Sequence, residues 1–477
     1  MADPRRWKAL AVLGVAYLMV VLDISIVNVA LPSIQADLGF STEDLQWVVS
    51  GYALTFGGFL LLGGRMGDLL GRRKLFMVGL ALFLVTSLMA GLSTSSEMLI
   101  VARLLQGAAG AILSPSVFSI TLVTFAEGAE RNKALGILGG IAGSGAAIGV
   151  LLGGVFTEYV GWQWIFFVNV PIAAATLFFV PRYVRESKAE GLTRHFDAFG
   201  AVSVTASLML LVFGLTQANR VGWASAQTIG VFIGSAVLMA LFLWNENRSR
   251  SPLVRLGIFR KRTLTGANLV GFGLGTVIFG IFFLLSLYMQ QVLGFSAMEA
   301  GVGYLAVALT VVVAATVSQG LVTRLGVKPV LVVGMALLTI GMVYFTQVSP
   351  DGSYWTDLFP GFLIIGVGMG FSFVPISIAA LAGVQGPEAG LASGLINTSQ
   401  QIGGALGLAL LTTVATTHTT SLLESGTGQA EALTSGFSWG FWVAAGFAFV
   451  SLITTLVVLR QDDLPAVGTE PATVPAG

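Results

Sequence analysis

The chain has 477 residues, of which 55% are hydrophobic and 10% are charged, with a formal net charge of +1. A soluble domain carries about 25% charged residues, so this composition indicates an integral membrane protein with several spans. No basic block suggests a nucleic-acid partner, and the lack of cysteine excludes disulfides, thiolate catalysis and cysteine metal sites.

Fourteen mostly apolar runs predict an all-α membrane protein with fourteen spanning helices, because a span needs about 20 apolar residues. The first run is too long for a signal peptide and has no clear small-residue cleavage site, so we expect it to be retained. The sequence after Gln461 is polar and contains proline, which predicts a disordered tail over residues 461–477. The predicted spans are 7–31, 47–69, 74–93, 98–125, 133–157, 162–182, 197–217, 227–247, 264–293, 298–322, 328–347, 355–382, 390–415 and 435–460.

Basic residues predict the orientation, because lysine and arginine collect on the cytoplasmic side of membrane proteins. If both termini are cytoplasmic, nearly all of the 24 Lys and Arg residues fall in cytoplasmic segments. The exceptions are Arg220, outside, and Arg103, within a span. We therefore expect both termini in the cytoplasm.

An internal repeat divides the chain, since residues 71–79 recur at 326–334 with an offset of 255. The same offset carries the first five spans onto the ninth to thirteenth, and the sixth matches the fourteenth only after a longer outer loop at 416–434. Parallel halves of this kind are a transporter architecture with the substrate site between them at midplane. The predicted parts are a six-helix half (1–182), an inserted helix pair with cytoplasmic loops (183–263) and a second six-helix half (264–460).

Asp23 is the one acid predicted deep in the membrane, where a carboxylate costs roughly 2.5 kcal/mol or more and is a functional candidate. Asp23 lies roughly 12 Å and Arg103 roughly 8 Å below the outer surface, at 1.5 Å per helical residue. We expect the two side chains to face one another or to share a water network, with proton uptake by Asp23 releasing Arg103. The alternatives are a static buried pair and an arginine that snorkels to the surface.

Residues 64–74 (GRMGDLLGRRK) form a predicted cytoplasmic loop in which Gly67 and Gly71 permit a tight turn and close helix approach. Asp68 can pair with Arg72 or face a helix N-terminus, and could latch an inner gate. The alternative is a solvated basic loop that only sets topology. The predicted gating residues are Gly64, Gly67, Asp68, Gly71, Arg72 and Arg73.

Residues 145–154 (GAAIGVLLGG) place Gly145, Gly149 and Gly153 on one helix face, next to Gly154. Such a face lets another helix backbone approach closely. Plain small-residue packing explains these glycines equally well.

Four segments resemble the major facilitator superfamily, and within it the fourteen-spanner drug:proton antiporters. They are residues 22–32 (LDISIVNVALP), 64–74, 103–110 (RLLQGAAG) and 145–154. The resemblance implies proton coupling at Asp23 and Arg103 and an antiporter motif at 145–154. The family usually has proline where this chain has Val150, which leaves a local bend of that helix in doubt.

Uncharged amides and aromatics are the predicted lining of the substrate cavity, which suits lipophilic organic molecules. With one deep acid we expect neutral, zwitterionic or monocationic compounds rather than dications. The candidates are Asn28, Gln106, Asn268, Phe272, Phe279, Gln290, Gln291, Gln319, Asn397, Gln400 and Gln401.

An enzyme is disfavoured, because the only histidines, His195 and His418, are predicted in loops on opposite faces and no nucleotide-binding P-loop is present. We expect no metal and no cofactor. The favoured function is proton-coupled export by a monomer in a bacterial plasma membrane, in contact with lipid. A nutrient or metabolite:proton symporter and a non-transporting membrane sensor remain as alternatives.

Overall fold

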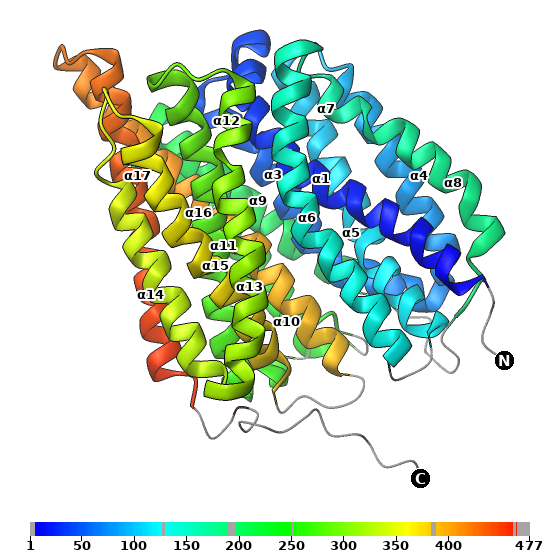
Figure 1. The fold of residues 1–477 in the computed structure, drawn as a ribbon. Coiled ribbons are helices and arrows are strands. Elements are labelled where there is room, and N and C mark those ends of the chain that lie inside the picture. The colour runs from blue at the N-terminus through cyan, green and yellow to red at the C-terminus, as the bar shows by residue number, and fades with distance from the viewer. Residues whose placement is uncertain are drawn as a thin grey trace.

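The computed structural model describes residues 5–125, 129–188, 197–249, 252–254, 256–382, 388–460 and residue 464. Within these ranges all regular structure is helical, because apolar membrane segments must satisfy their backbone hydrogen bonds internally. Figure 1 shows the helices gathered in two bundles side by side, one from the blue and cyan part of the chain and one from the green-to-red part.

The helices follow the predicted order along the chain. The first bundle contains α1 (Arg6–Leu38), α2 (Thr42–Leu45), α3 (Trp47–Leu70), α4 (Arg72–Gly91), α5 (Ser96–Thr124), α6 (Ala129–Tyr159), α7 (Trp164–Phe167) and α8 (Asn169–Tyr183). Next come α9 (Ala198–Val221), α10 (Ala226–Arg248) and the short helix η1 (Leu256–Arg260). The second bundle contains α11 (Arg262–Leu287), η2 (Tyr288–Val292), α12 (Ala297–Gly303), α13 (Leu305–Leu325), α14 (Val327–Phe345), η3 (Tyr354–Leu358), α15 (Phe359–Leu381), α16 (Glu388–Glu424) and α17 (Gln429–Val457).

Thirteen helical stretches in the described ranges are long and apolar enough to cross a membrane, so the protein is a multi-pass membrane protein. They coincide with the predicted spans except the fifth. There, α6 is a helix of 31 residues, but its described apolar stretch is the shorter Ala147–Tyr159. The count of fourteen therefore stays a prediction.

The two bundles share one internal packing pattern. In the first, α1 packs against α6 and α8, and α5 packs against α3 and α4. In the second, α11 packs against α16 and α17, and α15 packs against α13 and α14. At the junction of α3 and α4, Gly71 has φ 113°, and at the junction of α13 and α14, Gly326 has φ 87°. Both angles favour glycine, and both glycines belong to the repeat with the offset of 255.

The bundles meet where α3 contacts α16, α6 contacts α12 and α13, and α1 contacts α11. Helices α9 and α10 pack against each other, and α9 touches both α3 and α16. Leu208 and Val212 of α9 share a buried apolar cluster with Leu54 of α3 and with Ala405 and Ala409 of α16. The pair α9–α10 thus lies against the contact between the bundles.

The predicted outer loop at 416–434 is wrong, because α16 continues to Glu424 and α17 begins at Gln429. Threonine hydroxyls in this part of α16 donate to carbonyls four residues back, as Thr416 does to Thr412 at 2.8 Å, so a polar run stays helical. His418 accordingly lies in a helix, 2.9 Å from Ser435 Oγ of α17. His195 and nearly all of the predicted tail lie outside the described residues.

Candidate functional site

Asp23 of α1 and Arg103 of α5 form a buried ion pair. Arg103 Nη1 donates to Asp23 Oδ2 at 2.6 Å, and the two side chains are 1% and 0% exposed. The predicted pairing is confirmed, and the alternative of an arginine that reaches the membrane surface is wrong. A buried pair of this kind needs further hydrogen bonds to offset the loss of hydration.

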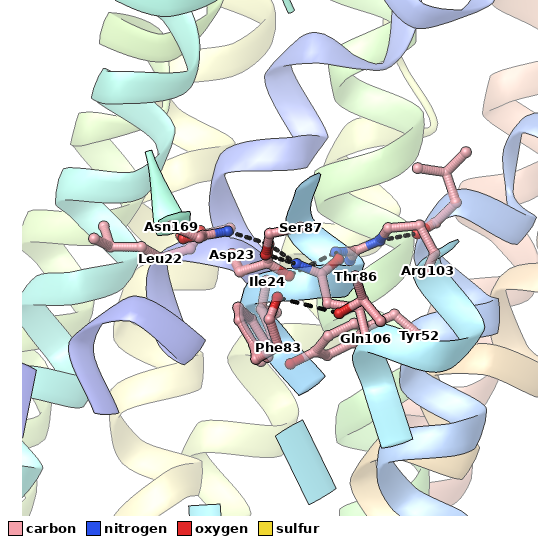
Figure 2. A network of polar contacts seen from close by, with 12 residues as sticks. Leu22, Asp23, Ile24, Tyr52, Phe83, Thr86, Ser87, Arg103, Gln106 and Asn169 are labelled. Carbon is pink, nitrogen blue, oxygen red and sulfur yellow. Dashed lines mark hydrogen bonds and ion pairs between the residues drawn. The ribbon is translucent and has the colours of Figure 1, made fainter. Parts of the chain in front are cut away.

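Gln106, one turn after Arg103 on α5, provides several of these bonds. Its Oε1 accepts from Arg103 Nη1 at 2.7 Å, and its Nε2 donates to Asp23 Oδ1 at 2.8 Å and to Ser87 Oγ of α4 at 2.9 Å. Gln106 is fully buried and belongs to this network, so its predicted place on a cavity wall is wrong. Figure 2 shows the side chains of Asp23, Arg103, Gln106 and Ser87 converging on one point.

Asn169, the first residue of α8, completes the carboxylate's partners by donating Nδ2–H to Asp23 Oδ1 at 2.9 Å (Figure 2). Sequence reasoning did not single it out. The available signal was an amide seven residues inside the predicted span 162–182, which also contains Gln163, but polar residues near span ends are common. The short helix α7 just before it brings α8 to the network.

The guanidinium of Arg103 is also held from the side. Its Nε donates to the carbonyl of Val48 at 2.9 Å. The ring of Tyr52 lies 4.4 Å and that of Phe166 lies 5.6 Å from Arg103 Cζ, within the range of cation–π attraction. Helices α3, α5 and the α7 turn therefore fix the orientation of Arg103, and none of these partners was predicted from the sequence.

The predicted gating segment contains a tight turn at Gly71, as its φ of 113° shows. The partner at this turn was not predicted. Glu186, after α8, accepts from the backbone N–H groups of Arg73 at 3.1 Å and Lys74 at 3.0 Å. It also lies 3.8 Å from Arg73 Nε, so a carboxylate does face a helix N-terminus here, that of α4.

The predicted gating glycines Gly64 and Gly67 leave room for a side chain. A Cβ on Gly64 or Gly67 would meet its nearest neighbour at 3.5 or 3.7 Å, which is ordinary contact. The close approach lies instead at Gly63, where a Cβ would be 2.3 Å from the carbonyl of Ala111 on α5. Arg72 donates its backbone N–H to Ser187 O at 3.0 Å. The side chain of Asp68 lies outside the described part of the structure.

The glycine face of α6 packs against α1. A Cβ would lie 2.9 Å from Val21 Cγ1 at Gly145, 1.9 Å from Ser25 Oγ at Gly149, and 2.5 Å from the carbonyl of Ile26 at Gly153. Asp23 is on the segment of α1 that this contact holds. On another face of α6, Gly154 approaches α12, where a Cβ would be 2.9 Å from the carbonyl of Ala297.

Several predicted cavity residues instead join the two bundles at one end. Ser286 Oγ donates to the carbonyl of Asn28 at 2.6 Å, Gln290 Nε2 donates to the carbonyl of Val29 at 2.9 Å, and Gln291 Nε2 donates to Gln35 Oε1 at 2.7 Å. These contacts tie α1 to α11 and η2.

The remaining cavity candidates are spread over the second bundle. Asn268 is buried and accepts from Ser399 of α16 at 2.7 Å. Gln319 and Asn397 are exposed. The others pack against neighbouring helices, Phe272 against Phe447, Phe279 against Gly404, Gln400 against Gly275 and Gln401 against Gly57. A shared substrate cavity stays a prediction.

Two bundles with one packing pattern, related by the offset of 255, are the architecture of a secondary transporter of the parallel-repeat class, and the ion pair lies within the first of them. A model of the Major Facilitator Superfamily matches residues 13–408, and the chain belongs to this family.

Two bacterial relatives support this assignment. The chain is 38% identical to the puromycin resistance protein pur8 of Streptomyces alboniger over 96% of this chain and 91% of the relative. It is 39% identical to the cephamycin export protein CmcT of Amycolatopsis lactamdurans over 85% of this chain and 84% of the relative.

Solved structures share the fold at low sequence identity. A bacterial homologue of the human lysosomal transporter Spinster, inward-facing and unoccupied, matches with a TM-score of 0.66 at 15% identity over 98% of this chain and all of the other. A peptide transporter POT in complex with sulfate matches with a TM-score of 0.69 at 15% identity over 96% of each chain.

Proposed function

We propose that the protein exports lipophilic small molecules from a bacterial cell and that proton entry at Asp23 drives the export. The family is that of membrane transporters, and the relatives named above confer antibiotic resistance or carry out export. Neutral, zwitterionic and monocationic compounds suit a membrane interior with a single deep acid.

The proposed topology has fourteen spans, both termini in the cytoplasm and a location in the plasma membrane. The continuous helix α6 supplies the fifth span in chain order, which brings the number of spans to fourteen. The proposed halves are residues 1–182 and 264–460, with the pair α9–α10 inserted between them. The repeated packing of the two bundles and the position of α9 across their contact support this division.

Under this topology the described structure is closed toward the outside. The hydrogen bonds of Asn28, Val29 and Gln35 to the second bundle lie at the outer end of α1. The close contact of Gly154 with α12 lies on the same side. Closure outside is the state in which an exporter takes up its substrate from within.

The single observation that carries the proposed coupling is the buried Asp23–Arg103 pair, which has no counterpart in the second bundle. The offset of 255 places Ile278 and Leu358 at these positions. Proton uptake by Asp23 removes one charge of the pair and leaves Arg103 a cation without its counter-charge. The tie between α1 and α5 then weakens, which lets α1 rearrange against the second bundle.

The test is efflux of puromycin from cells that overexpress the protein, with and without a protonophore. Accumulation is expected to fall and to recover when the proton gradient is collapsed. In proteoliposomes, Asp23→Asn is expected to abolish gradient-driven transport while substrate exchange without a gradient continues. Gradient-driven transport by Asp23→Asn would contradict the role of Asp23.

The same measurements separate the alternatives. Higher accumulation on overexpression would indicate uptake by a symporter. No transport of a panel of neutral and monocationic compounds would favour a sensor.

A further inference from the structure

The hydrogen-bond partners of Asp23 all have the same character. Gln106 and Asn169 donate N–H groups to Oδ1 at 2.8 and 2.9 Å, and Arg103 donates to Oδ2 at 2.6 Å. Three donors suit an ionised carboxylate, which only accepts. A protonated Asp23 carries an O–H that needs an acceptor, and a buried O–H without one is costly.

Gln106 cannot supply this acceptor without losing its bond to Arg103. Its Oε1 accepts from Arg103, and its Nε2 donates to both Asp23 and Ser87. Turning the amide over would place the donor Nε2 against Arg103, which has donors alone, and would break that bond. Gln106 is therefore fixed as a donor to Asp23.

Other groups around the pair are equally unsuited. Arg103 has donors alone, and Ser87 Oγ already accepts from Gln106. The hydroxyl of Tyr52 points along α5, because a Cβ on Gly110 would meet it at 2.8 Å. Arg103 from α5 and Tyr52 from α3 are the titratable groups at Asp23 among the described contacts, and α4 and α8 present the neutral Ser87 and Asn169.

Asn169 and Tyr52 each carry a buried oxygen without a hydrogen-bond partner, but the hydroxyl of Tyr52 lies toward Gly110. Asn169 is the one whose other amide atom, Nδ2, is already bonded to Asp23. A half-turn about the Cβ–Cγ bond exchanges the two atoms. Before the half-turn Oδ1 has no hydrogen-bond partner, and after it Nδ2 has none. The only bond broken is the one from Nδ2 to Asp23, and the bond that Oδ1 then accepts from Asp23 replaces it.

We propose that Asn169 is a positioning residue whose amide follows the proton on Asp23. It donates Nδ2–H to the ionised carboxylate, and it turns to accept the O–H of the protonated acid through Oδ1. This inference rests on the proposed function, in which Asp23 is the proton site. The amide would thereby supply the acceptor that the protonated state otherwise lacks.

The exchange of bonds at the Asn169 amide tests the proposal. While Asp23 is ionised, the amide donates N–H and its C=O has no partner, and when Asp23 is protonated the C=O accepts the O–H. The amide C=O band of Asn169 is therefore expected to shift to lower frequency when the carboxyl C=O band of Asp23 appears. The C=O of Gln106 stays bonded to Arg103 in both states, so its band is not expected to shift.

The measurement is an infrared pH titration of the full-length protein in lipid, following the carboxyl C=O band that is absent in Asp23→Asn. Asn397→Leu is the matched control, since Asn397 is exposed and bonds to a carbonyl of its own helix, and this variant should show the same amide shift as the wild type. In the wild type, a side-chain amide band that is absent in Asn169→Ala should change together with the carboxyl band.

The outcomes are distinguishable. A carboxyl band that titrates without any accompanying shift of the Asn169 amide band would overturn this inference and leave the proton site standing. The lack of any titrating band specific to Asp23 would overturn the proposed function, and this inference with it.

Discussion

Gln106 bonds to both members of the Asp23–Arg103 pair, accepting from Arg103 at 2.7 Å and donating to Asp23 at 2.8 Å. The spacing of three residues on α5 places Gln106 beside Arg103 on one helix face. One amide therefore supplies a further hydrogen bond to each member of the buried pair.

Gln106→Leu is expected to destabilise the protein by about 1–3 kcal/mol, because it leaves Arg103 and Ser87 with unmet hydrogen bonds in the interior. The thermal midpoint of the detergent-solubilised protein measures the effect, together with proton-driven transport, which should fall. Gln319→Leu is the control, since Gln319 is exposed. Equal midpoints for the two variants would show that Gln106 adds nothing to the pair.

Gly153→Ala is expected to cost about 1–3 kcal/mol, because a Cβ at this position would lie 2.5 Å from a backbone carbonyl of α1, which cannot rotate away. Gly140→Ala on the same helix is the control, since a Cβ there meets nothing within 4 Å. Thermal unfolding compares the two.

Two further variants refine this comparison, the single variant Gly149→Ala and the double variant Gly149→Ala with Ser25→Ala. The first clash at Gly149 is with Ser25 Oγ at 1.9 Å, so removal of that hydroxyl should restore part of the stability. No recovery in the double variant would place the strain elsewhere along the contact of α1 with α6.

Gly71→Ala should be more destabilising than Gly222→Ala. Both glycines have positive φ, 113° and 92°, so both substitutions carry backbone strain of about 1–3 kcal/mol. At Gly71 a Cβ would also lie 2.9 Å from the Glu186 carboxylate, whereas at Gly222 it meets nothing within 4 Å. The difference in thermal midpoint measures the Glu186 contact, and equal midpoints would show that this contact is easily displaced.

The sequence was sufficient to predict the Asp23–Arg103 pair, because two charges at similar depth in apolar helices have few other partners. The basic loop motif likewise predicted the turn at Gly71, since a cytoplasmic loop between spans leaves a local signature, and the repeat places Gly326 at the matching position. Both inferences depend on hydropathy and helix rise, which are local properties of the chain.

Asn169 and Glu186 could not be found in this way. Each acts across the bundle, Asn169 on a carboxylate 146 positions earlier and Glu186 on the start of a helix 112 to 113 positions earlier. Their roles depend on how α8 and the segment after it pack against α1 and α4, which no local pattern records. The prediction of an outer loop at 416–434 was wrong for a different, local reason, because threonine hydroxyls in α16 are satisfied by carbonyls four residues back within the helix.

The contact between Gln35 and Gln291 offers a test of alternating access. The two amides are joined at 2.7 Å across the bundles, at the proposed outer end, and the chain contains no cysteine that would compete for a thiol reagent. Gln35→Cys with Gln291→Cys, joined by a short cleavable thiol crosslinker, should hold the protein closed to the outside. Transport is expected to stop on crosslinking and to return after cleavage, because export requires this contact to open.

Each single cysteine variant treated with the same reagent is the control and should keep its activity. Full transport by the crosslinked double variant would mean that the α1–η2 contact stays closed throughout the cycle and that the substrate leaves by another route.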